Sequence, residues 1–224
     1  MNQYNEKFAR NPFSSEEQNI IASAKFAIVG MGGIGGFVLE NLVRSGAAKF
    51  LVFDHDKFEL SNFNRQLLAT DNSLGKSKMK EAMERARSIN KNIEIEGREK
   101  FASDSDLAGV ELIIDATDNI KTKIAICSSA KKHNIPDVFS SAGYGRGIVT
   151  VFIDYDIEKA FHLSDDLGRY KRPVSVLSSA AAISGSLAAS QAINVVLGKP
   201  FAKAPNAIFF DLFQEDVFWR AKLG

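Results

Sequence analysis

Phe26-Ala27-Ile28-Val29 is an apolar run of strand length, and it stops at Gly30-Met31-Gly32-Gly33-Ile34-Gly35-Gly36. Residues 37–44, Phe-Val-Leu-Glu-Asn-Leu-Val-Arg, then repeat apolar side chains at helical spacing. A second apolar run, residues 50–53, ends on Asp54. Strand, glycine turn, helix, strand and terminal acid form the layout of a dinucleotide-binding unit.

In this layout, glycines let backbone N–H groups approach phosphate at the start of a helix, and the acid accepts hydrogen bonds from ribose hydroxyls. Glycines that merely make a tight strand-to-helix turn are the alternative, but the flanking strands and the acid favour nucleotide binding. The predicted nucleotide-binding residues are Gly30, Gly32, Gly33 and Gly35 for the phosphates and Asp54 for the ribose.

A polar segment after Asp54 separates the two kinds of nucleotide that this layout could bind. Residues 61–66 read Ser-Asn-Phe-Asn-Arg-Gln, and residues 75–78, Gly-Lys-Ser-Lys, open another helical pattern. A nicotinamide-dependent dehydrogenase needs only the ribose acid here. An arginine and a lysine that converge on the glycine turn would neutralise a triphosphate, which carries more charge than a pyrophosphate bridge. The segment therefore favours ATP.

The order of these motifs resembles the ThiF/MoeB/HesA adenylating enzymes, the bacterial relatives of ubiquitin-activating enzymes. The resemblance rests on the glycine turn, Asp54, residues 61–66, Lys78 and the pair Asp118-Asn119, in that order, and covers roughly residues 4–200. It implies one ThiF-type ATP-binding adenylation domain over residues 1–224, with residues 1–24 as an N-terminal helical arm.

The resemblance also implies an activity and its partners. The expected reaction is ATP-dependent adenylation of a carboxylate, with release of pyrophosphate and with ATP and Mg²⁺ as cofactors. The expected substrate is the C-terminal glycine of a ubiquitin-like or sulfur-carrier protein, or a small peptide, and the expected assembly is a homodimer.

Individual roles follow from the same resemblance. Asn62, Arg65 and Lys78 are expected to hold the α- to γ-phosphates, with Lys76 as the fallback for Lys78. Asp118 is expected to hold Mg²⁺, a hard cation that takes carboxylate and phosphate oxygens. The other interpretation of Asp118-Asn119 is a helix N-cap, and both can hold at once. Asp115 is interpreted as structural.

Three further residues each have an ordinary structural interpretation and a functional one. Arg10 would ordinarily be a solvated charge, but the resemblance implies that it reaches the triphosphate of the other subunit in a dimer. Tyr144 and Arg146 lie in a glycine-rich bend, residues 140–147, between two predicted strands. Such a bend is ordinarily a turn, yet the resemblance makes both residues candidate contacts for an incoming carboxylate or peptide.

Cys127 is the single cysteine of the chain. Its apolar neighbours place it within a predicted helix as a small buried hydrophobe. Relatives with a catalytic cysteine carry it in the crossover region before the last long helix, and here that region, residues 161–173, contains none. We therefore expect no catalytic cysteine on this chain, and no zinc, because the paired Cys-x-x-Cys motifs of MoeB-type members are absent.

Composition fits a globular enzyme. The 224 residues are 45% hydrophobic and 25% charged, with a formal net charge of +1. That balance gives no electrostatic reason to expect nucleic acid or an anionic membrane as the main partner. Residues 174–197 are long enough to cross a membrane, but their repeated serines argue for a buried helix instead. The polar start of the chain shows no signal peptide, so a cytoplasmic location is expected.

The predicted fold is α/β, with a mainly parallel, doubly wound, Rossmann-like sheet and antiparallel strands at its C-terminal side, the last two forming a hairpin over residues 206–220. Three other functions stay open. They are an NAD-dependent oxidoreductase, a dehydratase that modifies tRNA threonylcarbamoyladenosine, and the non-catalytic subunit of a heterodimeric activating enzyme. The dehydratase usually carries a more basic surface than a net charge of +1 suggests.

Overall fold

The protein is described by a computed structural model that covers residues 3–100, 104–107, 109–163 and 175–224. Its strands are β1 (Lys25–Val29), β2 (Lys49–Phe53), β3 (Glu94–Arg98), β4 (Leu112–Asp115), β5 (Asp137–Gly143), β6 (Arg146–Phe152), β7 (Asn206–Asp211) and β8 (Phe218–Lys222). Its helices are α1 (Gln3–Phe8), α2 (Ser15–Ser23), α3 (Gly33–Arg44), α4 (Lys78–Ile89), α5 (Ile120–Lys132), α6 (Ile157–Ala160) and α7 (Ser178–Val196), with short 3-10 helices η1 (Leu60–Asn62) and η2 (Asp104–Leu107).

All eight strands form one sheet, in the order β3-β2-β1-β4-β5-β6-β7-β8. The first five in that order are parallel, and β5, β6, β7 and β8 pair antiparallel. The predicted α/β fold is therefore confirmed, including the antiparallel strands at the C-terminal side and the final hairpin. Because the order reverses between β1 and β4, a crevice opens at the carboxyl ends of these strands, where such sheets bind ligands.

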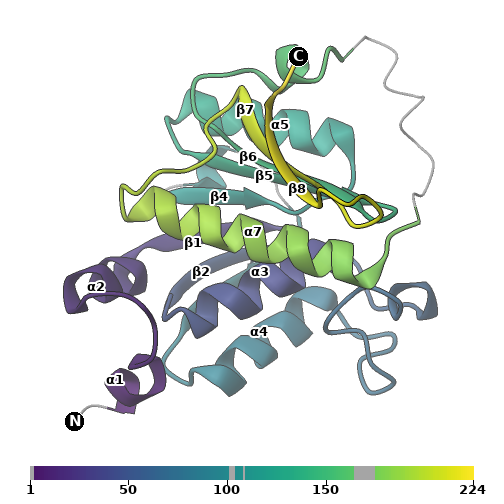
Figure 1. The fold of residues 1–224 in the computed structure, drawn as a ribbon. Helices are drawn as coiled ribbons and strands as arrows, with labels where there is room; N and C mark the ends of the chain where they lie inside the picture. Colours follow the sequence, from purple (N-terminus) through teal and green to yellow (C-terminus); the bar gives the residue numbers. More distant parts are fainter. Residues whose placement is uncertain (1–2, 101–103, 108, 164–174) are drawn as a thin grey trace.

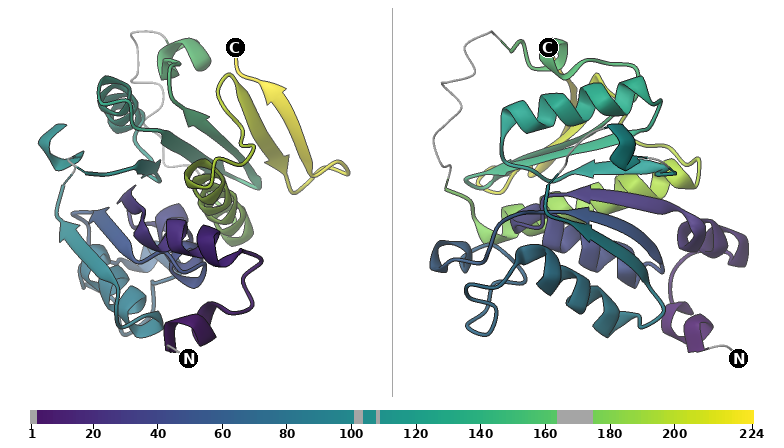
Figure 2. Two further views of the ribbon diagram at one scale, coloured as in Figure 1. Left: turned by 90° about the vertical axis from the view of Figure 1, so that its left-hand side faces the viewer. Right: turned by 180° about the vertical axis from the view of Figure 1, so that it is seen from behind.

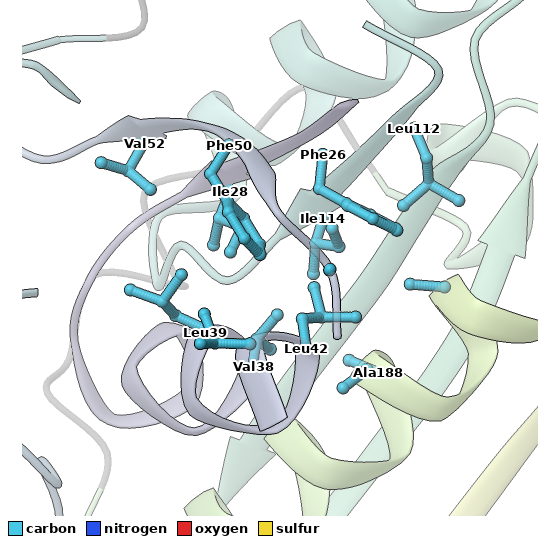
Figure 3. Close-up of a cluster of buried hydrophobic side chains, with 14 of the residues drawn as sticks. Phe26, Ile28, Val38, Leu39, Leu42, Phe50, Val52, Leu112, Ile114 and Ala188 are labelled. Carbon is cyan, nitrogen blue, oxygen red and sulfur yellow. The ribbon is translucent and has the colours of Figure 1, made fainter. Parts of the chain in front are cut away.

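Helices cover both faces of the parallel part of the sheet. Helices α3, α4 and α7 lie on one face and α5 on the other (Figures 1 and 2). Side chains of β1 alternate between them: Phe26 and Ile28 pack with α3 and α7, whereas Ala27 and Val29 pack with α5. A parallel strand that is buried on both faces explains why residues 26–29 form an unbroken apolar run. Figure 3 shows the first of these two cores.

Several predicted elements have different ends in the structure. The helical pattern from Lys76 becomes a helix only at Lys78, because Ser77 is its N-cap and accepts a hydrogen bond from Lys80 N. The long helix predicted at 174–197 is α7, and residues 164–174, most of the crossover region, lie outside the described chain. No helix within the described ranges is both long and apolar enough to span a membrane.

Helix α2 begins with a reciprocal cap at Ser14. Ser14 accepts a hydrogen bond from Glu17 N, and the Glu17 carboxylate accepts one from Ser14 N. This reciprocal cap satisfies two N–H groups that a helix start leaves open. Ile21 of α2 is fully buried, so the helix is anchored in the core beside α7.

Candidate active site

The glycine turn joins β1 to α3 through positions that exclude side chains. Gly30 has a φ of +93°, and a Cβ there would lie 2.9 Å from Ala116 O. A Cβ on Gly35 would lie only 1.8 Å from Gly30 O. Gly32 is the N-cap of α3, with no side chain to occupy the first N–H groups of the helix. Those groups and the positive end of the helix dipole form a ready site for an anion.

Asp54 lies at the end of β2 and is hydrogen-bonded to the turn. Its Oδ2 accepts from Met31 N at 2.7 Å, and its Oδ1 accepts from Asp56 N at 2.7 Å. Each carboxylate oxygen has a second lone pair, so both can accept one further donor such as a ribose hydroxyl. The half-buried side chain is thus fixed beside the phosphate cradle with acceptor capacity left.

The two candidate lysines differ sharply in the structure. The Lys78 side chain is 8% exposed, and its Nζ lies 2.9 Å from Asp56 Oδ2. The Lys76 side chain is 56% exposed and pairs with Glu81 at 3.4 Å on the surface. Lys78 is therefore the lysine whose ammonium group lies beside the segment that carries Asp54 and Asp56. Lys76 faces solvent instead.

Residues of the polar segment lie against the glycine turn. The Arg65 carbonyl O and Cγ are 3.4 and 3.5 Å from the position that a Cβ on Gly33 would take. The Arg65 guanidinium donates to Ser61 O and to Asn64 Oδ1, each at 2.8 Å. Asn62 is buried, and its Oδ1 accepts from Glu59 N, which shapes η1. The backbone and Cγ of Arg65 therefore lie against the glycine turn, and Asn62 stabilises the backbone before it.

Gln66 is a residue to which the sequence analysis gave no role. It is buried, and its Nε2 lies 3.5 Å from the position of a Cβ on Gly32. Its Oε1 has no hydrogen-bond partner among the described residues. An unpaired acceptor beside the glycine turn is a polar group left for a ligand. Its place next to Arg65 in the motif was the only sequence signal for it.

The loop after β4 carries the candidate metal ligand. Asn119 caps α5, because its Oδ1 accepts from Lys121 N and Thr122 N, and Asp118 is exposed at the carboxyl end of the strand. Both predicted uses of this pair are therefore sterically compatible. Asp115 is buried, accepts from Thr117 N and Oγ1, and pairs with Lys123 Nζ at 3.1 Å, in agreement with its structural interpretation.

The described residues contain one group of three side chains that could converge on a metal, Asp54, His55 and Asp56. Asp56 is already neutralised by Lys78. Asp118 instead offers an exposed carboxylate at the strand end that faces the crevice, and one carboxylate with phosphate oxygens is a donor set that suits Mg²⁺.

Residues 4–223 match the sequence profile of the ThiF family. The chain belongs to this family. It is 26% identical over 219 residues to the molybdopterin-synthase adenylyltransferase of Escherichia coli K12, covering 94% of this chain and 88% of that protein. It is 29% identical over 160 residues to the tRNA threonylcarbamoyladenosine dehydratase of Bacillus subtilis, covering 68% of this chain and 63% of that protein.

The ThiF fold is also found in solved structures. Escherichia coli MccB, solved with AMPCPP and MccA, aligns with a TM-score of 0.77 at 17% identity, over 93% of this chain and 66% of that one. The likeness therefore concerns the fold, and this chain spans about two thirds of the solved one. The predicted family, fold and enzyme class, a nucleotidyltransferase, are confirmed.

In this ThiF-family chain, Tyr144 and Arg146 lie at the same end of the sheet as the polar segment. Residues 175–177 connect the two: Asn64 Nδ2 donates to Val176 O, and Tyr144 N donates to Ser175 O. Tyr144 is 65% exposed, with a φ of +54°. Arg146 donates from Nε to Asp211 Oδ2 at 2.8 Å, while most of its side chain faces solvent. Both side chains are accessible beside the crevice.

Arg10 lies at the other end of the subunit. Its neighbour Asn11 donates to Arg44 O, at the end of α3, and Lys7 donates to Ile89 O, at the end of α4. Because the glycine turn is at the start of α3, a twelve-residue helix of about 18 Å separates it from this contact. Figure 1 shows α1 on the opposite side from the loop that carries the polar segment. The exposed Arg10 cannot serve its own crevice in this arrangement.

Cys127 is buried in α5, as predicted. Burial raises the pKa of its thiol to about 12, and the nearby charge of Asp137 adds to the shift. Only the thiolate is a good nucleophile. Cys127 is therefore inert at neutral pH, in line with the expectation that this chain has no catalytic cysteine.

Proposed function

We propose that this chain binds ATP over the glycine turn and adenylates the C-terminal carboxylate of a small protein or peptide. One observation carries the proposal: Lys78, although nearly buried, is joined through Asp56 and Asp54 to the Met31 N–H of the glycine turn, and the backbone and Cγ of Arg65 lie against Gly33 of the same turn. Two cations on segments that are linked to the turn can supply the charge that a triphosphate needs and a hydride carrier does not.

The roles of the residues follow from their positions. The first N–H groups of α3 receive phosphate oxygens, Asp54 orients the ribose, and Lys78 and Arg65 bind the β- and γ-phosphates, with Asn62 supporting Arg65. A substrate carboxylate oxygen attacks the α-phosphorus, the bond to the bridging oxygen breaks, and pyrophosphate leaves with the electron pair. The cations stabilise the charge that develops on the departing oxygen.

Magnesium suits the donors that this site offers. Asp118 would hold the ion, which would supply positive charge against the phosphates. The residues of this chain still determine where the triphosphate lies, since Asn119 fixes the loop before α5 and Asp115 fixes the same loop from within.

The substrate class follows from the accessible surface at this end of the sheet. Tyr144 and Arg146 are exposed beside the crevice, and an arginine with free N–H groups can bind a carboxylate. The molybdopterin-synthase adenylyltransferase and the MccB–MccA complex support a small protein or peptide as the substrate. An extended C-terminal tail could reach the α-phosphate along this route.

The test is ATP–pyrophosphate exchange against carboxylate substrates, including small proteins that end in Gly-Gly. Lys78→Ala and Asp118→Ala should each lower exchange at least a hundredfold while circular dichroism and thermal unfolding stay unchanged. Lys76→Ala is the matched variant on the same segment, and it should retain exchange within about twofold because that side chain faces solvent. Exchange at the wild-type rate in Lys78→Ala would refute the assignment.

A second candidate is a dehydratase that acts on a modified tRNA nucleoside, and the similarity to the Bacillus subtilis enzyme favours it. It shares ATP activation but needs tRNA as the acceptor. One assay of ATP turnover distinguishes the two functions. Turnover that requires tRNA, and that no protein with a C-terminal carboxylate stimulates, would support the dehydratase and contradict our proposal. Binding of NADH in competition with ATP would favour an oxidoreductase over both.

A further inference from the structure

Asp56 connects three parts of the crevice that lie far apart in the sequence. Its N–H donates to Asp54 Oδ1, its carbonyl O accepts from Lys78 N at 3.0 Å, and its carboxylate pairs with Lys78 Nζ at 2.9 Å. Asp54 in turn accepts from Met31 N in the glycine turn. An unbroken chain of hydrogen bonds therefore runs from the turn, through both aspartates, to the first residue of α4.

We propose that Asp56 is the positioning residue that aims Lys78 at the triphosphate. The inference rests on the proposed function and deepens it, because it explains how a nearly buried lysine is held in one direction. Asp56 does not need to touch the nucleotide. It acts through Lys78.

The burial of Lys78 is the first argument. Its side chain is 8% exposed, so few water molecules can bind its ammonium group, which needs a partner from the protein. Asp56 is the acidic side chain that pairs with it in the described structure. Without this carboxylate, the ammonium group would lose the partner that holds it in place and would turn toward water, away from the phosphates.

Donor capacity is the second argument. A lysine ammonium has three N–H donors, and the pair with Asp56 uses one. Two donors are left for phosphate oxygens, so Asp56 can remain bound while Lys78 binds ATP. Its backbone bonds to Asp54 and Lys78 do not involve the side chain. Removing the carboxylate should therefore affect the direction of Lys78 rather than the fold of the segment.

The opposite possibility is that Asp56 competes with ATP for the ammonium group of Lys78. If Asp56 merely occupied Lys78 until ATP displaced it, its removal would strengthen ATP binding. The two ideas predict changes of opposite sign, so the affinity of the Asp56→Ala variant decides between them.

The experiment is calorimetric binding of ATP and of adenosine to the wild type, Asp56→Ala, Lys78→Ala and the double variant. Adenosine lacks phosphates and so reports the integrity of the crevice without Lys78. We expect Asp56→Ala to weaken ATP about tenfold or more, the scale of a lost charge-assisted hydrogen bond. Adenosine affinity should stay within about twofold. In the Lys78→Ala background, Asp56→Ala should change ATP affinity by less than about twofold.

Glu81→Ala is the matched control. Glu81 lies in the first turn of α4 and pairs with Lys76, which precedes the helix, and its removal should leave both affinities unchanged. Asp56→Asn, which keeps the shape but not the charge, is the second variant and should also weaken ATP without affecting adenosine.

Three results would overturn the inference. They are tighter or unchanged ATP binding in Asp56→Ala, an equal loss for ATP and adenosine, and additive effects of the two substitutions. Wild-type protein that binds ATP but catalyses no pyrophosphate exchange would contradict only the proposed adenylation. The ATP affinities of the wild type, the two single variants and the double variant would still test the role of Asp56. Wild-type protein that binds no ATP would contradict both.

Discussion

Asp137 is fully buried at the start of β5, and neither of its carboxylate oxygens has a hydrogen-bond partner in the described chain. Burial raises the pKa of Asp137 well above its usual range, the charge of Asp115 raises it further, and Lys123 opposes the shift. A raised pKa in the folded state means that folding favours the protonated acid. The resulting stability is present below about pH 4, the unfolded pKa, and is lost as pH rises toward the folded pKa.

Replacing Asp137 by a residue that cannot ionise should abolish this loss of stability as pH rises. We expect Asp137→Leu to raise the free energy of unfolding by about 1–3 kcal/mol at pH 8 and by less at pH 4. Urea unfolding of both proteins between pH 4 and 8 measures the difference. Asp216→Asn, at an exposed acid, should leave the pH profile unchanged. A destabilisation by Asp137→Leu that is the same at every pH would show that Asp137 does not titrate in this range.

Gly35 and Gly36 are adjacent in α3 but meet different surroundings. A Cβ on Gly35 would collide with Gly30 O at 1.8 Å, whereas the nearest atom to a Cβ on Gly36 is Leu67 Cβ at 3.7 Å. Gly35→Ala should therefore cost more than about 3 kcal/mol of stability or prevent folding. Gly36→Ala should be neutral or stabilise by about 0.5–1 kcal/mol, because alanine favours a helix. Equal melting temperatures of the two variants would contradict the geometry of the turn.

Sequence patterns identified the residues whose roles are local. The glycines, the acid after β2 and the cap at Asn119 are recognisable because each depends on the few residues around it. Asp56, Lys123 and Asp137 were missed because their partners lie 8 to 22 residues away and belong to other elements. No local pattern distinguishes a lysine that folds inward from one that faces solvent.

Helices α3 and α7 depend on one close contact. A Cβ on Gly185 of α7 would lie 2.6 Å from Phe37 Cβ and 2.7 Å from Ile34 O, both in α3. We expect Gly185→Ala to destabilise the protein by about 1–3 kcal/mol, since one helix must move. ATP affinity should fall as well, because Ile34 belongs to the first turn of α3. Ser190→Ala, on the exposed side of α7, should change stability by less than about 0.5 kcal/mol.

The contact explains the composition of α7. Small residues let a buried helix pack closely against its neighbours. In the structure they serve close packing of α7 against α3, a helix of the same layer. Element types were predictable from periodicity. Their ends were not: α4 begins at Lys78 rather than at Lys76, and its N-cap Ser77 also pairs with Lys57 in an isolated bridge, a contact between distant residues.

At the scale of the whole molecule, the position of Arg10 determines which crevice it can reach. Within one subunit, Arg10 and the glycine turn lie at opposite ends of α3. A role for Arg10 in phosphate chemistry therefore requires a second copy of the chain, as the proposed homodimer would provide. In a twofold dimer in which α1 of one subunit packs beside the crevice of the other, each crevice would receive the Arg10 of its partner.

This arrangement predicts complementation between two inactive variants. Arg10→Ala and Lys78→Ala homodimers should each have little pyrophosphate exchange, since every site lacks one cation. Refolding equal amounts together gives half heterodimers, in which one of two sites combines Lys78 of one chain with Arg10 of the other. Exchange should then recover to about a quarter of the wild-type activity. Wild-type exchange by the Arg10→Ala homodimer alone would place Arg10 outside the reaction. A mixture as inactive as its components, despite heterodimers confirmed by differential tagging, would contradict action of Arg10 on the other subunit's site.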